Sequence, residues 1–442
     1  MDSDIRLNPA FRGRATSSTL LINESVTRLW EQGEEILQMG FGESRFAVHP
    51  KLEAAMIASA AHKSYLPARG LPRLCDAVAA YHTDKLALPI SSHQVIIGPG
   101  SKALIFALQM ALDADLFLPT PSWVSYRPQA ELLNRSVVHI PSNVADGYRF
   151  DLDEFDGLVK AAGNRQKLLI INSPNNPTGQ MLDEPFLREL AEYCRKERVL
   201  VLSDEIYFRI QHGQTQHCSI AKYYPEGTFI LGGPSKHLSV GGWRLGVAIV
   251  PDTRAGVEVM AALEVIAGEI WASAAAPMQF AALTAYSGDP DIETYIDDCA
   301  DIHGIRTRFL YEQLSVLGVH CTKPQGAFYV TANFDNFSAE LARSGVRSSP
   351  ELAKHLLERH AIATLAGDTF GIPEATLSLR LATSYLDMEK DSDSKRLLGL
   401  FARGLGEAEF MSKAHHPKTH AAIEGFSDFL NSVESSHERR LA

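Results

Sequence analysis

The sequence predicts an α/β fold with a mostly parallel sheet, followed by a smaller α+β domain. Seven short β-rich apolar runs occupy the middle of the chain: VIIG from Val95, LFLP from Leu116, VVHIP from Val137, LLIIN from Leu168, LVLS from Leu200, FILGG from Phe229 and GVAIV from Gly246. Several are almost continuously apolar, which is typical of strands covered by helices on both faces. Helical patterns lie between many of them, for example at residues 101–112 and 184–197, and this alternation favours a parallel sheet.

The chain is predicted to contain four parts. Residues 1–55 form an N-terminal arm and part of the small domain, residues 56–305 the large domain, residues 306–404 the small domain and residues 405–442 a polar tail. In the small domain, Ser349-Pro350-Glu351 predicts a helix that Ser349 caps and that has proline in its first turn. The tail contains HHPKTH at residues 415–420, for which a solvated segment is favoured over a metal site.

The composition is that of an ordinary globular protein and excludes some classes of partner. The 442 residues are 45% hydrophobic and 21% charged. A formal net charge of -11 argues against nucleic acid and against a membrane surface, because such partners select for excess Lys and Arg. The N-terminus has no apolar run, and no stretch approaches the roughly 18 apolar residues of a membrane helix. Five scattered cysteines without a CxxC pair favour reduced thiols, so we expect a cytoplasmic protein.

Three short motifs follow predicted strands, at the edge where open α/β sheets bind ligands. GPGSK at residues 98–102 precedes a helix, and its glycines and the free N–H groups of the helix start can hold a phosphate or form a plain turn. Trp123 can stack on a flat heterocycle or fill the core. SPNNPTG at residues 173–179 specifies a rigid turn that can direct an amide at a ligand.

Four charged residues occur at or near predicted strands. Asp204 ends a buried strand, where a carboxylate needs a partner such as a protonated ring nitrogen. Lys236 follows another strand, and desolvation there would make its amine a nucleophile and a proton carrier, although most lysines are solvated. Arg244 can return to a phosphate. Arg380 lies among alternating apolar residues, so it grips either a substrate carboxylate or a structural carboxylate.

Together these pieces, in this order and spacing, resemble the class I aminotransferases of PLP-dependent transferase fold type I. The resemblance extends from about Gly40 to Thr383, and its specific strings are SPNNPTG, SDEIY, SKHLSVGGWRLG, KPQGAFY and LRLAT. It implies a large domain with a mostly parallel seven-stranded sheet, a smaller α+β domain, pyridoxal 5'-phosphate as cofactor and an obligate homodimer.

The resemblance also implies a role for each matching residue. Lys236 forms a Schiff base with the cofactor and then moves a proton between the substrate Cα and the cofactor. Asp204 keeps the pyridine nitrogen protonated, and Tyr207 and Asn176 bind the phenolic oxygen. The other implied contacts are stacking by Trp123, phosphate binding by Ser101, Lys102, Ser235 and Arg244, substrate binding by Arg380, Asn176 and Gly42, and a phosphate contact by Tyr65 across the subunit interface.

The sequence departs from the family pattern at two positions and is distinctive at a third. Gly233 replaces a serine that often contributes a phosphate hydroxyl, and Cys75 replaces a common arginine. Dicarboxylate-specific relatives carry an arginine about 35 residues after the lysine, a position that here looks like Trp271. Because no Arg or Lys lies between Arg254 and Arg306, we expect apolar or aromatic substrates to be favoured over aspartate, unless another arginine serves.

The leading hypothesis is an aminotransferase that exchanges an amino group between an L-amino acid and a 2-oxo acid, and two other functions are considered beside it. A lyase or synthase on the same scaffold, similar to aminocyclopropane-carboxylate synthase or a β-lyase, would share nearly every residue named above. A transcription regulator that senses the cofactor would need a DNA-binding domain, and only about 40 residues precede the GFG segment. We therefore expect the aminotransferase, and retain the lyase as the alternative.

Overall fold

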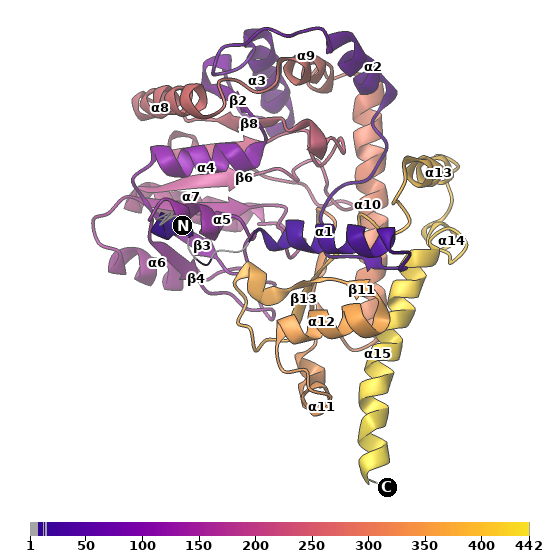
Figure 1. Cartoon of the computed structure of the whole chain (residues 1–442). Helices are drawn as coiled ribbons and strands as arrows, with labels where there is room; N and C mark the ends of the chain where they lie inside the picture. Colours follow the sequence, from indigo (N-terminus) through magenta and orange to yellow (C-terminus); the bar gives the residue numbers. More distant parts are fainter. Residues whose placement is uncertain (1–7, 12, 14–15, 442) are drawn as a thin grey trace, which may run out of the picture.

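A seven-stranded sheet forms the centre of the large domain in the structure, a computed structural model that describes residues 8–11, 13 and 16–441 (Figure 1). The strand order is β2-β8-β7-β6-β5-β3-β4. Only β8 runs antiparallel to its neighbours, so the prediction of a mostly parallel sheet is confirmed. The bounds are β2 Val95–Gly98, β3 Asp115–Pro119, β4 Val137–Ile140, β5 Lys167–Asn172, β6 Val199–Asp204, β7 Thr228–Gly232 and β8 Gly246–Ile249.

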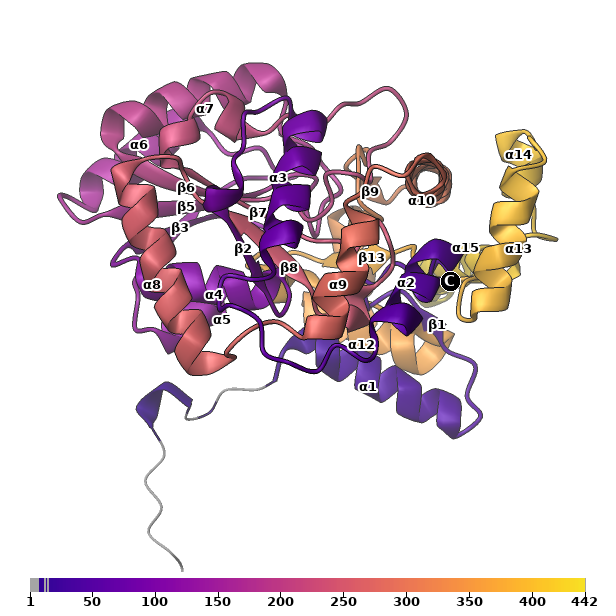
Figure 2. The ribbon, with the colours of Figure 1, turned by 90° about the horizontal axis from the view of Figure 1, so that it is seen from above.

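Helices cover both faces of this sheet (Figure 2). In β5, Leu168 and Ile170 pack in an apolar cluster with α4 and α8, whereas Leu169 and Ile171 pack in a second cluster with α6 and α7. Burial on both faces explains why these strands are continuously apolar in the sequence. The helices are α2 Pro50–Ser59, α3 Pro72–Leu86, α4 Ser101–Ala111, α5 Tyr126–Leu132, α6 Leu152–Ala161, α7 Glu184–Glu197, α8 Arg254–Ile270 and α9 Ala276–Ala285.

The small domain is built on a four-stranded antiparallel sheet of order β12-β13-β10-β9. The N-terminal segment joins it, because β1 (Leu37–Gln38) pairs in parallel with β11 (Ile362–Ala363). The long helix α10 (Pro290–Val316) spans the predicted boundary at residue 305 and links the two domains. The other elements are β9 His320–Cys321, β10 Tyr329–Asn333, β12 Leu365–Ala366, β13 Ser378–Ala382, α1 Ser18–Glu31, α11 Ser338–Arg343 and α12 Ser349–His360.

Helix α12 begins close to the predicted position, but its cap is shifted by one residue. The N-cap is Ser348, whose Oγ accepts a hydrogen bond from the backbone N–H of Glu351 at 3.4 Å. Ser349 is the first helical residue and lies beside Asp368, with 3.2 Å between its Oγ and the carboxylate. Two adjacent serines before Pro350 satisfy the same sequence pattern, so the pattern alone could not choose between them.

The C-terminal segment is helical and packs on the protein as far as Val433, which differs from the solvated polar tail expected for residues 405–442. It forms α14 (Glu407–Phe410) and α15 (Pro417–Leu441) after α13 (Asp391–Phe401), and α15 lies beside α10 in Figure 1. Phe426 and Phe429 enter the apolar core of the small domain. Asp387 holds the start of α15, because its carboxylate accepts hydrogen bonds from the backbone N–H groups of Lys418 and Thr419 at 2.8 and 3.0 Å.

Candidate active site

The carboxyl ends of β2, β5, β6 and β7 lie at one edge of the large sheet, because these strands are parallel to one another. This edge carries the start of α4 after β2, the SPNNPTG turn after β5, Asp204 at the end of β6 and Lys236 after β7. Polar side chains at this edge form the ligand site in open α/β folds. The motifs that are far apart in the sequence therefore share one region.

Asp204 is a buried carboxylate with two hydrogen-bond donors. Its Oδ2 accepts a bond of 2.6 Å from the hydroxyl of Tyr126, and its Oδ1 accepts one of 3.2 Å from the backbone N–H of Ile206. Burial raises the pKa of Asp204 to about 6, and the Tyr126 hydroxyl opposes this rise. Sequence reasoning missed Tyr126. The sequence did contain one indication, because Tyr126 lies three residues after Trp123, which is about one helical turn.

Lys236 projects toward the segment that contains Gly42. Its Nζ donates a hydrogen bond of 2.8 Å to the Gly42 carbonyl and lies 5.8 Å from the centre of the Tyr207 ring. Burial lowers the pKa of Lys236 to about 8, against the attraction of the Glu43 carboxylate. The amine is thus easier to deprotonate than a surface lysine, as a nucleophile or base requires. Glu43 is a second residue that sequence reasoning did not single out.

The start of α4 forms a cradle with Arg244. Gly100 precedes the helix with φ of 96°, and a Cβ at this position would lie 2.3 Å from Nη2 of Arg244. The guanidinium donates to the Gly241 carbonyl at 2.8 Å. Ser101 and Lys102 open the helix, where backbone N–H groups have no intrahelical acceptor. A guanidinium beside a helix N-terminus is suited to bind a phosphate group.

Trp123 lies beside the start of α4, and Ser235 directly precedes Lys236. Nζ of Lys102 lies 5.1 Å from the centre of the Trp123 ring, and the same ring packs edge-on against Tyr126 at 5.2 Å. Burial lowers the pKa of Lys102, and repulsion by Arg244 adds to this effect. Ser235 is buried directly before Lys236. Trp123 is therefore linked to the Asp204 partner on one side and to the start of α4 on the other.

Arg380 is a fully buried guanidinium that forms no ion pair with a carboxylate of residues 8–11, 13 or 16–441. Its Nη1 donates to Oδ1 of Asn176 at 3.3 Å, and its Nη2 donates to the Gly40 carbonyl. Its Nε has no hydrogen-bond partner within the described chain, and the Tyr329 ring lies 4.9 Å from its central carbon. A buried cation without a counter-ion is costly, so this site is suited to a small anion.

Tyr207 and Tyr329 close the region between Lys236 and Arg380. Their hydroxyl oxygens are 2.7 Å apart, and both rings are buried. The Tyr329 hydroxyl also donates to the Gly42 carbonyl at 3.5 Å. Tyr329 belongs to the KPQGAFY string but received no role from the sequence.

Tyr65 and Trp271 were also predicted as site residues. Within the described chain, neither forms a hydrogen bond or a ring contact with Lys236, Asp204 or Arg380. The side chain of Tyr65 is 90% exposed on the surface. Trp271 follows α8 and packs against the apolar cluster of α4 and α8, and its buried Nε1 has no partner within the described residues. The predicted role of Tyr65 depends on a second chain, whereas that of Trp271 depends on a substrate.

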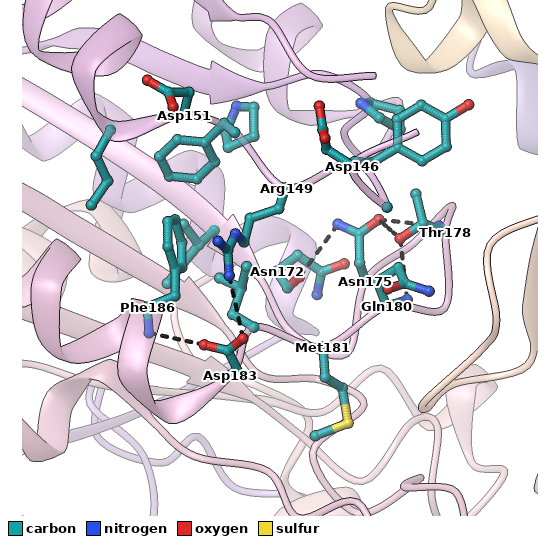
Figure 3. A pocket seen from close by; sticks show the side chains of 18 of the residues that line it. Asp146, Arg149, Asp151, Asn172, Asn175, Thr178, Gln180, Met181, Asp183 and Phe186 are labelled. Atoms are coloured by element: carbon teal, nitrogen blue, oxygen red, sulfur yellow. Dashed lines mark hydrogen bonds and ion pairs between the residues drawn. The ribbon is translucent and has the colours of Figure 1, made fainter. Parts of the chain in front are cut away.

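Two grooves adjoin the site. One has a volume of about 640 Å³ and is lined by Asn175 and Thr178 of the SPNNPTG turn. Figure 3 shows its lining side chains, among them Arg149, which donates to the carboxylate of Asp183 at 3.3 Å. This groove is connected to the site through Asn172, whose amide donates to the Asp204 carbonyl and accepts from the backbone of Asn176, both at 2.8 Å. The second groove, of about 630 Å³, is lined by Lys102, Ser122, Trp123 and Phe370 together with Phe11 and residues 16–18.

The described residues offer neither a membrane span nor a metal centre. Within residues 8–11, 13 and 16–441, no helix combines the length and the apolar character needed to cross a bilayer. The same residues contain no group of three or more His, Cys, Asp or Glu side chains placed to hold a metal ion. In the HHPKTH string, Nδ1 of His416 lies 2.9 Å from the Phe410 carbonyl and Nε2 of His420 lies 2.7 Å from that of Met411. These two imidazoles therefore contact backbone carbonyls at the end of α14. All five cysteines are free thiols.

Known proteins with similar sequences are aminotransferases. The chain is 33% identical to an aspartate aminotransferase of Geobacillus stearothermophilus over 382 residues, which are 84% of this chain and 93% of that protein. It is 30% identical to an aspartate/prephenate aminotransferase of Thermus thermophilus over 398 residues, 89% of this chain and 97% of that one.

Solved structures agree with the sequence comparison. The aspartate aminotransferase of Thermus thermophilus with maleate superimposes with a TM-score of 0.78 at 26% identity, and the match covers 91% of this chain and all of that chain. The aromatic aminotransferase of Pyrococcus horikoshii shares the fold with a TM-score of 0.73 at 23% identity, over 86% of this chain and 99% of that chain. The family model for aminotransferase class I and II matches residues 34–391. The chain therefore belongs to the class I and II aminotransferases, enzymes that depend on pyridoxal phosphate.

Proposed function

We propose that Lys236, Asp204 and Arg380 are the central residues of an aminotransferase that exchanges an amino group between an L-amino acid and a 2-oxo acid. The observation that carries this proposal is the buried Arg380, which has no carboxylate partner in the described chain. An α-carboxylate is a small anion that amino acids and 2-oxo acids both possess. One such site therefore serves both substrates.

The residues of the site fit pyridoxal phosphate. When bound, this cofactor supplies an electron sink for the bonds at the substrate Cα. Asp204 would face the ring nitrogen, since a buried carboxylate with a raised pKa gains from a charged donor. Arg244, Ser235, Ser101 and the backbone at Lys102 would hold the phosphate, Tyr207 and Asn176 the ring oxygen, and Trp123 the ring face.

Lys236 is proposed to bind the cofactor covalently and to transfer the proton at the substrate Cα. Its pKa of about 8 leaves a sizeable fraction of neutral amine near neutral pH. A protonated surface lysine would be a poor base at this pH. Nearby Arg380 and Arg244 add to the lowering of the pKa of Lys236.

The α-carboxylate is proposed to bind between Arg380, the Asn176 amide and the backbone at Gly42. Arg380 already donates to Asn176 at 3.3 Å and to the Gly40 carbonyl. Planar guanidinium donors bind carboxylates through two parallel hydrogen bonds. This contact would fix the substrate with its Cα toward Lys236.

We propose that the donor side chain is apolar or aromatic rather than dicarboxylic. No Arg or Lys lies between Arg254 and Arg306, and spacing along the sequence suggests Trp271 for the position where dicarboxylate-specific relatives carry an arginine. Aspartate is the second candidate, because two similar proteins are named as aspartate or aspartate/prephenate aminotransferases. A panel of amino donors with one 2-oxo acid decides between them: aspartate or glutamate far ahead of phenylalanine and leucine would overturn the apolar preference.

A lyase or synthase on the same residues is the alternative chemistry. In an aminotransferase, a good donor without an acceptor converts the absorbance of the lysine-bound cofactor into that of the amine form. Release of ammonia and an oxo acid with an unchanged spectrum would instead favour the lyase.

We propose that the enzyme is a homodimer in which the partner subunit's Tyr65 completes the phosphate site. A tyrosine that is 90% exposed, together with Ile57 at 71% and Ile270 at 56%, leaves apolar surface that a second copy could cover. Mixing inactive Lys236→Ala subunits with inactive Tyr65→Ala subunits would restore part of the activity if sites are shared. A cytoplasmic location remains a prediction.

Lys236→Ala is the test of the central proposal. This variant should retain the cofactor without a covalent bond and lose turnover. Borohydride reduction followed by mass spectrometry should label the wild-type peptide that contains residue 236 and leave the variant unlabelled. Activity similar to the wild type would refute the assignment.

A further inference from the structure

Three polar side chains from distant parts of the chain meet near the segment that carries Lys236: Ser44 and His303 are buried and Ser239 is half-buried. Ser44 belongs to the segment that follows β1, Ser239 to the loop that follows β7, and His303 to the long helix α10. The hydroxyl oxygens of Ser44 and Ser239 are 2.6 Å apart, and Nε2 of His303 lies 3.0 Å from the Ser44 oxygen. The exposed fractions of Ser44 and His303 are 3% and 1%.

This cluster lies close in the sequence to both partners of the hydrogen bond between Lys236 and the Gly42 carbonyl. Ser44 is two residues after Gly42, and Ser239 is three residues after Lys236. Ser239 has a φ of 56°, a left-handed conformation that a residue with a side chain keeps when its surroundings hold it. The cluster thus ties together the two backbone segments whose side chain and carbonyl meet at the site.

The surroundings of His303 determine how it takes part. Burial lowers its pKa well below the usual range, and the charges of Arg306 and His212 act in the same direction. The Phe46 and Phe328 rings lie 5.0 and 4.9 Å from its ring. Nδ1 has no hydrogen-bond partner within the described residues. A neutral imidazole with its proton on Nε2 donates to the Ser44 hydroxyl, which then donates to Ser239.

We propose that His303 is a positioning residue that holds Gly42 and Lys236 in register through Ser44 and Ser239. The inference rests on the proposed roles of Lys236 and Gly42. An ammonium Nζ has three N–H groups, but a nitrogen bonded covalently to the cofactor keeps at most one. Covalent attachment would thus leave the Lys236 nitrogen with fewer N–H groups to donate to the Gly42 carbonyl, and the Ser44–Ser239–His303 cluster would maintain the separation of the two segments.

Two amide substitutions at position 303 separate this role from simple packing. The Gln amide nitrogen can reach the place of Nε2, which has a partner, whereas the Asn amide nitrogen reaches the place of Nδ1, which has none. In the holoenzyme, His303→Gln should keep kcat/KM within about 3-fold of the wild type. His303→Asn and His303→Phe should lower it by about 10- to 100-fold, the size expected for a small misplacement of reacting groups. The pKa of the lysine-bound cofactor, followed by absorbance, should shift in Asn and Phe but not in Gln.

Further variants protect the test against misfolding. Ser239→Ala removes one hydroxyl and should reduce kcat/KM, with little additional loss when it is combined with His303→Asn, because both break one chain of hydrogen bonds. His93→Asn is the matched control, since His93 is exposed and pairs with Asp252 at 2.9 Å. Equal effects of Gln and Asn, or wild-type values for Asn and Ser239→Ala, would overturn the inference. A failure of the inference about His303 would leave the proposed function intact as long as Lys236→Ala is inactive in the same assays. An active Lys236→Ala would instead refute the proposed function itself.

Discussion

Asp204→Asn should make the cofactor-free protein more stable at pH 8 while abolishing activity. Burial raises the pKa of Asp204 from 3.8 to about 6. This difference of about 2 units corresponds to about 3 kcal/mol at 1.36 kcal/mol per unit. Because the folded-state pKa lies above the unfolded value, the stabilising contribution is present below pH 4 and is lost as pH rises through 6. We expect Asp204→Asn to raise the free energy of unfolding at pH 8 by about 1–3 kcal/mol. The gain is smaller than the full value of about 3 kcal/mol because an Asn NH₂ group that faces the Ile206 N–H would be unfavourable.

Urea unfolding of cofactor-free wild type and variant at pH 8 and pH 5 checks this expectation, and the gain should shrink by about half at pH 5. Glu205→Gln is the matched control in the next position. Burial alone would raise the pKa of Glu205, but His217 and the hydroxyls of Ser219 and Ser203 outweigh it and hold the pKa below its usual range. This control should therefore be destabilised at pH 8. A loss of stability in both variants would refute the reasoning about Asp204.

Three other substitutions test separate parts of the structure. Arg380→Lys removes paired donors and should raise KM for the amino donor by about 10- to 100-fold with a smaller change in kcat, as measured by steady-state kinetics. Gly100→Ala places a Cβ at φ 96° within 2.3 Å of Arg244, so cofactor affinity measured by fluorescence titration should fall by about 10-fold or more. Phe426→Ala should lower the free energy of unfolding by about 3–5 kcal/mol in urea, because its side chain is fully buried in the small-domain core.

The large domain could be predicted because its sequence signals are local. Continuous apolar runs such as residues 168–172 indicate strands buried on both faces, and the structure has the seven predicted strands in one sheet. The carboxyl ends of parallel strands share one edge, so Asp204 and Lys236 could be assigned to one region before any distance was known. Spacing along the chain was enough for this step.

Contacts between distant side chains could not be predicted in the same way. The 2.6 Å bond from Tyr126 to Asp204 joins positions 78 residues apart. The hydrogen bonds among Ser44, Ser239 and His303 span 195 and 259 residues. Serine, tyrosine and histidine at such separations have no spacing rule, so only the folded chain identifies these pairs.

The C-terminal helix was missed because polar residues outnumber its apolar ones. Ala422, Phe426, Phe429, Leu430 and Val433 are nevertheless spaced by four, three, one and three residues and are all buried. This is the 3.6-residue period of a helix with one apolar face. Composition suggested a solvated tail, whereas periodicity would have indicated α15.

Cofactor binding and folding should be coupled through Asp204. Burial raises the pKa of this carboxyl to about 6. At pH 8, which lies above this pKa, the carboxyl is mostly ionised even though its buried site disfavours the charge. A charged ring nitrogen is the donor that would offset this cost, so the cofactor should bind the wild type with a lower Kd than it binds Asp204→Asn. Mass action gives about 2.7 kcal/mol of stabilisation at 100 times Kd, so at equal free cofactor concentration the wild type should gain more stability than the variant. Asp204→Asn has no charge to compensate, and its loaded and cofactor-free forms should differ by less in urea unfolding. Equal stabilisation of the two proteins by the cofactor would mean that the carboxylate is not the group that couples binding to folding.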